Sequence, residues 1–215
     1  MNNASIQCPQ INTIPITLGT ELPDKYRHCP PQRLGQFWHG TEAMPTEGAS
    51  AYIGANRDGL CFYVKLEDSD IFSTATADNQ RMWTLGDTLE VFVKPGTERT
   101  DYWEVHVTPN DFLMDIHIPD RAKFTGGEIT WDEVVAPSSK STKSVVVGAG
   151  GWAVELCMPW SAFNVEGVPA AGTIWLFAVC RYNYNGDLND PEHSSTAAFT
   201  EPGFHRYEEY TCLVF

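Results

Sequence analysis

Carboxylate and imidazole side chains recur at alternating positions in three consecutive strand-like runs, residues 88–94, 101–108 and 112–118. The runs carry, in chain order, Glu90, then Glu104 and His106, then Asp115 and His117. Carboxylates accept hydrogen bonds from hydroxyl groups, and an imidazole can donate or accept one. Paired carboxylates can also hydrolyse glycosides, and carboxylates with imidazoles can ligate transition metals. These residue types therefore leave three chemistries open: hydroxyl binding, glycoside hydrolysis and metal ligation.

Turns at residues 95–101 and 109–111 predict that the three runs pair as a meander. In that arrangement we expect Glu90, Glu104, His106, Asp115 and His117 to share one face of the sheet. The other face is then apolar and belongs to the core; it holds Leu89, Val91, Val93, Trp103, Val105, Val107, Phe112, Met114 and Ile116. The polar face is either solvated or a binding site, and aromatic rings beside hydrogen-bonding groups are suited to a sugar.

Strand signals dominate the rest of the chain as well. The segments "AYIGANRDGLCFYVKLED", "SVVVG", "GWAVELCMP" and "TIWLFAVCRYNY" are rich in β-formers and are separated by turn residues, whereas "PWSAFNV" is the one short helical candidate. This pattern predicts an all-β protein with a single antiparallel β-sandwich domain over residues 1–215. Residues 1–35 are expected to form an irregular N-terminal wrap, and the apolar C-terminal tail to close an edge as the last strand. Trp103, Trp152 and Trp175 are expected in the core.

The charge balance narrows the range of partners. Among 215 residues, 14 are basic and 28 are acidic, which gives a formal net charge of −14. This acidity argues against nucleic acid and anionic membrane surfaces as partners, and favours a neutral polar ligand or a hard cation. No apolar run approaches the length of a membrane span, and the N-terminus shows no secretory signal. The expected location is cytoplasmic, or extracellular or periplasmic if a signal has been removed.

Cysteines and a short acidic loop add two further predictions. None of the six cysteines forms a C-x-x-C pair. Cys61, Cys157 and Cys180 lie in strand-like runs, where a free thiol acts as a small hydrophobe. Cys8 and Cys29 flank a loop-like region and can form a disulfide if the protein is exported. In "LEDSDIFS", Asp68 and Asp70 either bind calcium or cap a turn through their side-chain oxygens.

Several motifs resemble carbohydrate-binding module family 9 and its DOMON-like relatives. They are "DGLCFYVKLEDSDIF", "WTLGDTLEVFVKP", "YWEVHVTPN", "GWAVELCMPWSAF" and "GTIWLFAVCRY", and the resemblance covers residues 36–215. It implies an immunoglobulin-like β-sandwich in which a Trp before the G-D-x-x-E strand forms one wall of a sugar slot. Carried over to this sequence, Trp83 is the stacking wall, Glu90 accepts a hydroxyl, Glu104 and His106 supply polar contacts, and Arg181 contacts the ligand or Glu90.

The resemblance also has a gap. The family pattern places a second stacking aromatic near the C-terminus, but "NDPEHSSTAAFTEPG" contains no Trp. Tyr184 or Phe199 is expected to substitute, or the slot is open on one side. The loss of one stacking wall would weaken sugar binding by about 1–3 kcal/mol.

The resemblance implies a non-catalytic domain that binds a mono- or oligosaccharide, often at a chain end, with calcium as a structural ion and glycan-degrading enzymes as partners. Three alternatives stay open. DOMON-like relatives hold haem for electron transfer, and Met82, Met114, His106 and His117 are available here, although no C-x-x-C-H motif is present. The acidic face could instead hydrolyse glycosides, or the domain could be an inert interaction module.

Overall fold

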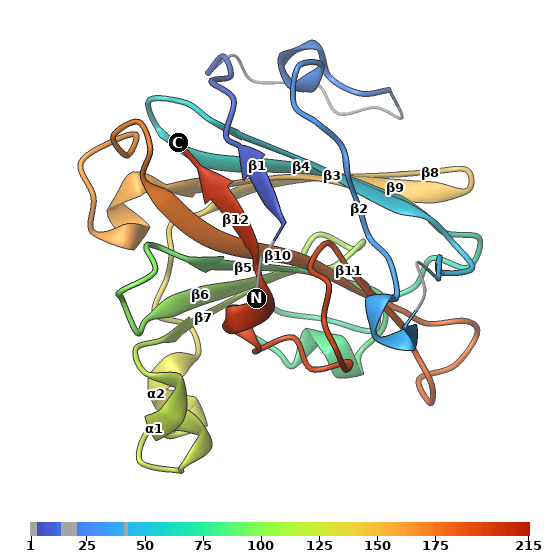
Figure 1. Ribbon diagram of the computed structural model, residues 1–215. Coiled ribbons are helices and arrows are strands. Elements are labelled where there is room, and N and C mark those ends of the chain that lie inside the picture. The colour runs from blue at the N-terminus through green and yellow to red at the C-terminus, as the bar shows by residue number, and fades with distance from the viewer. Residues whose placement is uncertain (1–3, 14–20, 41–42) are drawn as a thin grey trace.

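Two β-sheets pack face to face in the computed structural model, which describes residues 4–13, 21–40 and 43–215 (Figure 1). The larger sheet has the order β1-β12-β10-β5-β6-β7, with β11 also paired to β10, and the smaller has the order β2-β3-β4-β9-β8. All these ladders are antiparallel apart from that of β1 with β12. The single-domain antiparallel β-sandwich predicted from the sequence is confirmed.

The strands are mostly short. Those of the larger sheet are β1 (Ser5–Gln7), β5 (Thr88–Lys94), β6 (Tyr102–Val107), β7 (Leu113–Ile118), β10 (Ile174–Asn183), β11 (Glu192–Ser195) and β12 (Thr211–Val214). Those of the smaller sheet are β2 (Gln32–Arg33), β3 (Ala49–Ala55), β4 (Gly59–Glu67), β8 (Thr142–Gly148) and β9 (Gly151–Pro159). Single 3-10 turns are η1 (Asp24–Tyr26), η2 (Phe37–His39), η3 (Met82–Thr84), η4 (Trp160–Phe163) and η5 (Tyr207–Glu209).

The main core lies between the two sheets and follows the alternation of the strands. Leu89, Val91 and Val93 of β5 point into it together with apolar residues of β4, β6, β9 and β10. Burial of each such side chain contributes about 1.5–3 kcal/mol. Trp103, Trp152 and Trp175 all belong to this core, as predicted.

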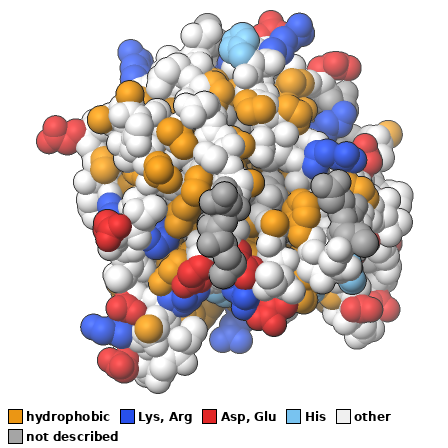
Figure 2. Space-filling model, in the orientation of Figure 1, with side chains coloured by type: hydrophobic (Ala, Val, Ile, Leu, Met, Phe, Trp, Pro, Cys, Tyr) orange, Lys and Arg blue, Asp and Glu red, His pale blue; other side chains and the backbone are white. Residues whose placement is uncertain are grey.

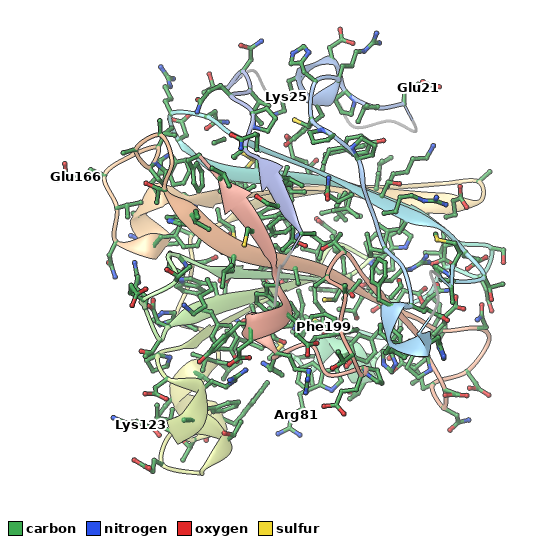
Figure 3. All side chains as sticks on the ribbon, viewed as in Figure 1. Glu21, Lys25, Arg81, Lys123, Glu166 and Phe199 are labelled. Atoms are coloured by element: carbon green, nitrogen blue, oxygen red, sulfur yellow. A yellow bond between two sulfur atoms is a disulfide. The ribbon has the colours of Figure 1, made fainter. Side chains whose placement is uncertain are left out.

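A second apolar layer covers the outer face of the larger sheet. Phe92, Tyr102 and Met114 of the sheet pack there with Phe199 and other aromatics of the C-terminal loop. In Figure 3, Phe199 lies on this side of the larger sheet, and Arg81 extends further out on the same side. The outer face is therefore a second core rather than a solvated surface, and any polar side chain within it is withdrawn from water.

Two short helices cross this layer beside β7, and neither was predicted from the sequence. They are α1 (Arg121–Thr125) and α2 (Trp131–Val134), and they project below the larger sheet in Figure 1. The Asp120 side chain accepts a hydrogen bond from the Lys123 N–H, and the Glu133 carboxylate accepts one from the Thr130 N–H at 2.9 Å. These contacts satisfy backbone donors that a helix start leaves free. The T-x-x-E spacing of 130–133 was the available sequence signal.

The chain termini close the larger sheet differently from the prediction. β12 is the expected last strand, but β1 pairs with it in parallel and occupies the edge instead. The N-terminal segment expected to be irregular thus contributes β1 to one sheet and β2 to the other. The expected helical turn near Pro159 is present as η4, with Pro159 directly before it.

The cysteine predictions are corrected by the structure. Cys61 and Cys157 are directly paired across β4 and β9 and form a disulfide, so they are not free thiols. Cys8 and Cys29 are buried and unbonded to each other, whereas Cys180 is a buried free thiol as expected. Facing positions on neighbouring strands bring two Cβ atoms within disulfide reach. Nothing in single-strand alternation reveals such a pairing.

The surface carries dispersed charge. Figure 2 shows acidic and basic side chains interspersed over one face of the molecule. Among the residues that the structure describes, no helix combines the length and the apolar character needed to span a bilayer.

Candidate functional site

Glu90, Glu104 and His106 come together on the outer face of the larger sheet, and we call them the Glu–His cluster. The ladder between β5 and β6 pairs Glu90 directly with His106, and Glu104 lies two residues before His106 on the same face. His106 Nε2 lies 2.6 Å from Glu104 Oε1 and 3.3 Å from Glu90 Oε1. Both strands have neighbours on either side, so the backbone that carries the cluster is rigid. The predicted grouping of these three residues is confirmed.

The Glu–His cluster is buried but incompletely hydrogen-bonded. The side chains of Glu90, Glu104 and His106 are 4%, 5% and 0% exposed. Glu104 Oε2 and His106 Nδ1 have no hydrogen-bond partner among the residues that the structure describes. A buried polar atom that lacks a partner costs about 1–3 kcal/mol, and more where it is charged. The fold therefore keeps polar atoms here that a hydrogen-bonding ligand could satisfy.

The protonation of the cluster is shared among its members. Burial raises the pKa of Glu90, and the neighbouring Glu104 charge raises it further, against the lowering effect of His106. Burial alone would lower the pKa of His106, but the two carboxylates raise it above its ordinary value. Burial opposes ionisation of Glu104 too, yet His205 and His106 lower its pKa. The arrangement thus favours a charged Glu104 against a protonated His106, with Glu90 inclined to keep its proton.

Trp83 stands beside the cluster in η3. Its ring centroid lies 5.5 Å from that of His106, at an interplanar angle of 70°, and 5.5 Å from that of Trp131 in a similar edge contact. The ring is half-buried, so it is neither sealed in the core nor free in solvent. Its backbone carbonyl accepts a hydrogen bond from the Tyr184 hydroxyl. An apolar surface therefore adjoins the polar cluster.

The Gly86–Asp87 turn fixes Trp83 relative to β5. A Cβ on Gly86, whose φ is +133°, would lie 2.5 Å from the Phe72 carbonyl oxygen, so only glycine fits. The buried Asp87 carboxylate accepts hydrogen bonds from the backbone N–H groups of Phe72 at 2.7 Å and Tyr184 at 2.9 Å. Gly86 and Asp87 thus hold the backbone at Phe72 and at Tyr184 against the start of β5.

Three further residues, which border the cluster or Trp83, were missed from the sequence. His205 Nδ1 lies 3.7 Å from Glu104 Oε2 and 2.8 Å from the Tyr102 hydroxyl, and 47% of its side chain is exposed. Tyr182 follows the Glu90-facing Cys180 on the same face of β10, and alternation along that strand could have indicated it. His205 and Trp131 lie in segments without periodicity, where no local pattern indicates which way a side chain points.

The sequence matches the family described as carbohydrate family 9 binding domain-like over residues 20–210. The chain belongs to this family. No curated protein matches the sequence. The family assignment confirms the resemblance derived from the motifs around Trp83 and Glu90.

Solved structures share the fold of this family 9-like chain at low sequence identity. A protein from Bacteroides uniformis has a TM-score of 0.71 and 14% identity, and the match covers 100% of both chains. A family 9 carbohydrate binding module from Caldicellulosiruptor kristjanssonii, in complex with cellotriose, has a TM-score of 0.65 and 11% identity over 97% of this chain and 93% of that one. A family 9 module from the same organism in complex with glucose has a TM-score of 0.65 and 11% identity, over 98% of this chain and 94% of that one.

Two residues predicted for the polar face of this family 9-like domain lie on the opposite face. β6 and β7 pair His106 with Met114 and Val105 with Asp115, so Asp115 and His117 point toward the sandwich interior. Because the connection from Thr108 to Phe112 has five residues, even-numbered residues of β6 face even-numbered residues of β7. A connection one residue longer or shorter would place Asp115 and His117 on the other face of the sheet. The Asp115 carboxylate accepts a hydrogen bond from the Ser139 N–H at 3.1 Å. The expectation that these two residues join Glu90 is therefore wrong.

Arg181 is also displaced from its expected partner. It pairs with Leu89 across the ladder and so points away from Glu90. Its Nη2 lies 3.0 Å from Asp68 Oδ2, which also accepts a hydrogen bond from the Trp152 indole at 3.2 Å. Asp68 Oδ1 accepts one from the Asp70 N–H, the turn contact that was the alternative to calcium. A guanidinium thus supplies the positive charge beside Asp68, and calcium at Asp68 and Asp70 stays an untested prediction.

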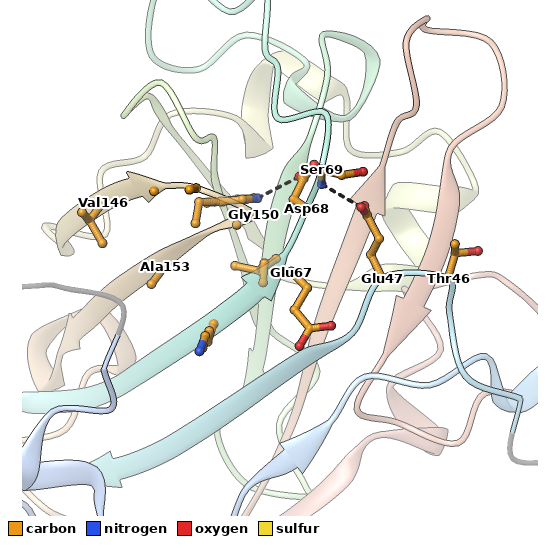
Figure 4. A pocket seen from close by; sticks show the side chains of 14 residues that line it. Thr46, Glu47, Glu67, Asp68, Ser69, Val146, Gly150 and Ala153 are labelled. Carbon is orange, nitrogen blue, oxygen red and sulfur yellow. Dashed lines mark hydrogen bonds between the residues drawn. The ribbon is translucent and has the colours of Figure 1, made fainter.

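A separate cavity of about 430 Å³ opens at the end of β4 and β9, beside this ion pair (Figure 4). It is lined on one side by Glu47, Glu67 and Ser69 and on the other by Val146 and Ala153. Glu47 accepts a hydrogen bond from the Ser69 N–H at 2.7 Å, and Glu67 accepts one from the Gly48 N–H at 3.2 Å. The acids of this cavity accept hydrogen bonds from backbone N–H groups, whereas those of the Glu–His cluster contact the His106 imidazole.

Proposed function

We propose that this chain is a non-catalytic domain that binds carbohydrate at the Glu–His cluster. The observation that carries the proposal is the buried, unpartnered Glu104 Oε2 in a polar cluster set within an apolar layer. Hydroxyl groups donate to such a carboxylate, while the half-buried face of Trp83 suits the C–H face of a sugar ring. Family membership supports the same conclusion.

Access to the cluster involves His205. This side chain contacts Glu104 and is about half exposed, so its movement would open a route from solvent to the carboxylate. Tyr182 and Trp131, which lie half-buried nearby, are the aromatic partners for the ring beyond Trp83, whereas Tyr184 is 4% exposed and donates its hydroxyl to the Trp83 carbonyl. Phe199 is 1% exposed in the second apolar layer, which does not favour it as a wall.

The carboxylate geometry favours binding over hydrolysis. One oxygen of Glu90, one of Glu104 and a nitrogen of His106 all lie within 4.8 Å of one another. Retaining glycosidases separate their carboxyl groups by about 5–5.5 Å and inverting ones by about 6.5–9.5 Å. Both carboxylates here also contact one imidazole nitrogen, so they are engaged with His106 rather than placed on either side of a glycosidic bond.

Haem ligation by a pair of histidines is not favoured either. His106 and His117 lie on opposite faces of the sheet, so they cannot hold one iron together. His106 Nε2 also contacts Glu104 directly. Association with glycan-degrading enzymes, which the family resemblance implies, remains a proposal for binding partners.

Calorimetry with glucose and cellotriose tests the proposal. We expect one binding site per chain, and Trp83→Ala should weaken binding by about 1–3 kcal/mol through the loss of one stacking face. Tyr52→Ala serves as a matched control, because it removes a half-buried ring from the smaller sheet. Equal affinity of the Trp83→Ala variant and the wild type would reject this site, as would the absence of binding to a panel of glycans.

A further inference from the structure

We propose that the Glu–His cluster is also a binding site for a divalent transition-metal ion, with Zn²⁺ as the best fit. Among the described residues, Glu90, Glu104 and His106 are the one group of three or more ligating side chains whose donor atoms lie within 4.8 Å of one another. One imidazole nitrogen with two carboxylate oxygens is a donor set that suits Zn²⁺.

The spacing of the donor atoms fits a tetrahedral ion. Metal–ligand bonds of about 2.1 Å at tetrahedral angles place neighbouring donors about 3.4 Å apart. His106 Nε2 and Glu90 Oε1 are already 3.3 Å apart, and His106 Nε2 and Glu104 Oε1, at 2.6 Å, need to separate by less than 1 Å. Rotation of the Glu104 side chain supplies that change without any movement of the strands.

Charge and unused hydrogen-bonding capacity point the same way. When both carboxylates are ionised and the imidazole is neutral, as metal ligation requires, the two negative charges match those of a divalent cation. Glu104 Oε2 has no hydrogen-bond partner, so the carboxylate retains a free donor atom for the ion. By contrast, Asp68 and Glu47 have their oxygens occupied by an arginine, an indole and backbone N–H groups.

Three protein ligands leave a fourth position open. An ion there would carry a water molecule or take a further ligand, and His205, whose Nδ1 lies 3.7 Å from Glu104 Oε2, is the nearest imidazole in contact with the cluster. The proposal does not depend on carbohydrate binding. Because metal and sugar would use the same carboxylates, each should alter the affinity for the other.

Metal titration of the chelator-treated protein, without sugar, tests the inference. We expect one Zn²⁺ or Co²⁺ per chain with micromolar affinity, and visible Co²⁺ bands typical of four-coordinate nitrogen and oxygen ligands. His106→Ala and Glu104→Gln should each weaken Zn²⁺ binding at least tenfold. His28→Ala, which removes an exposed imidazole, and Cys212→Ser, which removes the partly exposed thiol, should leave it unchanged. Ca²⁺ should not compete, because it prefers six to eight oxygen ligands.

Two results would overturn the proposal: no stoichiometric Zn²⁺ binding by the wild type, or binding that Glu104→Gln leaves intact. Intense near-ultraviolet bands from thiolate-bound Co²⁺ would likewise assign the ion to cysteine. The circular dichroism of each variant shows whether it folds, and the isosteric Glu104→Gln keeps the test decisive if His106→Ala does not fold. Sugar titrations in EDTA test carbohydrate binding alone, and metal titrations without sugar test metal binding alone. Either proposal can therefore fail without deciding the other.

Discussion

Two buried acid–base clusters lie on opposite faces of the larger sheet, and they differ in how completely the oxygens of their carboxylates are hydrogen-bonded. At one, Arg181 and Asp68 form an ion pair with side chains 1% and 0% exposed, and Trp152 donates a further hydrogen bond. At the other, Glu104 meets His106 with one carboxylate oxygen and leaves the second without a partner. Asp68 thus has both oxygens hydrogen-bonded within the fold, whereas Glu104, although it contacts His106, keeps one oxygen available to a donor from outside.

The largest expected effect on stability is at the ion pair between Arg181 and Asp68. Arg181→Met leaves Asp68 as an uncompensated buried charge, and we expect the free energy of unfolding to fall by about 3–5 kcal/mol. Sugar affinity per folded molecule should stay as in the wild type, because Arg181 faces away from Glu90. Urea denaturation followed by calorimetry measures both quantities. A variant of wild-type stability would contradict the assignment of a structural role to the pair.

At the Glu–His cluster we expect a larger effect on sugar binding than on stability. Glu104→Gln keeps the shape of the side chain but removes the charge, and sugar binding should weaken by about 1.5–3 kcal/mol, the range for hydrogen bonds to charged groups. The free energy of unfolding should fall by only about 1 kcal/mol, because the amide oxygen of glutamine can still accept a hydrogen bond from His106 Nε2. Calorimetry and urea denaturation of the same preparation provide the comparison. Strong destabilisation with unchanged affinity would reverse the roles of the two clusters.

A third, partly exposed ion pair, between Arg99 and Asp101, should contribute less to stability than the buried pair of Arg181 and Asp68. Arg99 binds both carboxylate oxygens of Asp101, at 2.7 and 2.6 Å, and His117 approaches one of them at 3.2 Å. Burial alone would raise the pKa of Asp101, but the hydrogen bonds and charges of His117 and Arg99 lower it below its ordinary value. The ionised carboxylate therefore stabilises the fold above about pH 4, the unfolded value, and this contribution is lost as the pH falls through the folded pKa.

Asp101→Asn should accordingly cost about 1–2 kcal/mol of unfolding free energy at pH 7, allowing for solvent screening. The difference from the wild type should shrink as the pH is lowered below 4. Urea denaturation at pH 7, 5 and 3 checks this dependence. A difference that stays constant, or grows toward acid, would show that Asp101 is not stabilised in its ionised form.

The sequence predicted the sandwich and the principal cluster because both depend on local alternation. Glu90, Glu104 and His106 occupy even positions in two strands joined by a short turn, so parity alone placed them on one face. The prediction for Asp115 and His117 was wrong because it placed the odd-numbered residues of β7 on the same face as the even-numbered residues of β6. In the structure, even-numbered residues of both strands share one face. The apolar character of Met114 and Ile116 suggested the sandwich interior, whereas those residues pack in a second apolar layer that alternation does not reveal.

Long-range pairing accounts for the remaining misses. Arg181 and Asp68 are separated by 113 residues, and Cys61 and Cys157 by 96. Which acid meets which base, and which thiol meets which, depends on the order of strands in each sheet. His205 reaches the cluster from an irregular loop, and Trp131 reaches Trp83 from the short helix α2, so no strand alternation predicts the direction of either side chain.

The most direct test of the central claim is a crystal structure of the protein soaked with cellotriose or glucose in the presence of EDTA. The account predicts a sugar whose hydroxyl group lies within hydrogen-bonding distance of Glu104 Oε2, with the ring against Trp83 and His205 moved from its position in the free protein. A sugar bound instead in the cavity beside Asp68 and Glu67, with the Glu–His cluster unchanged, would contradict it.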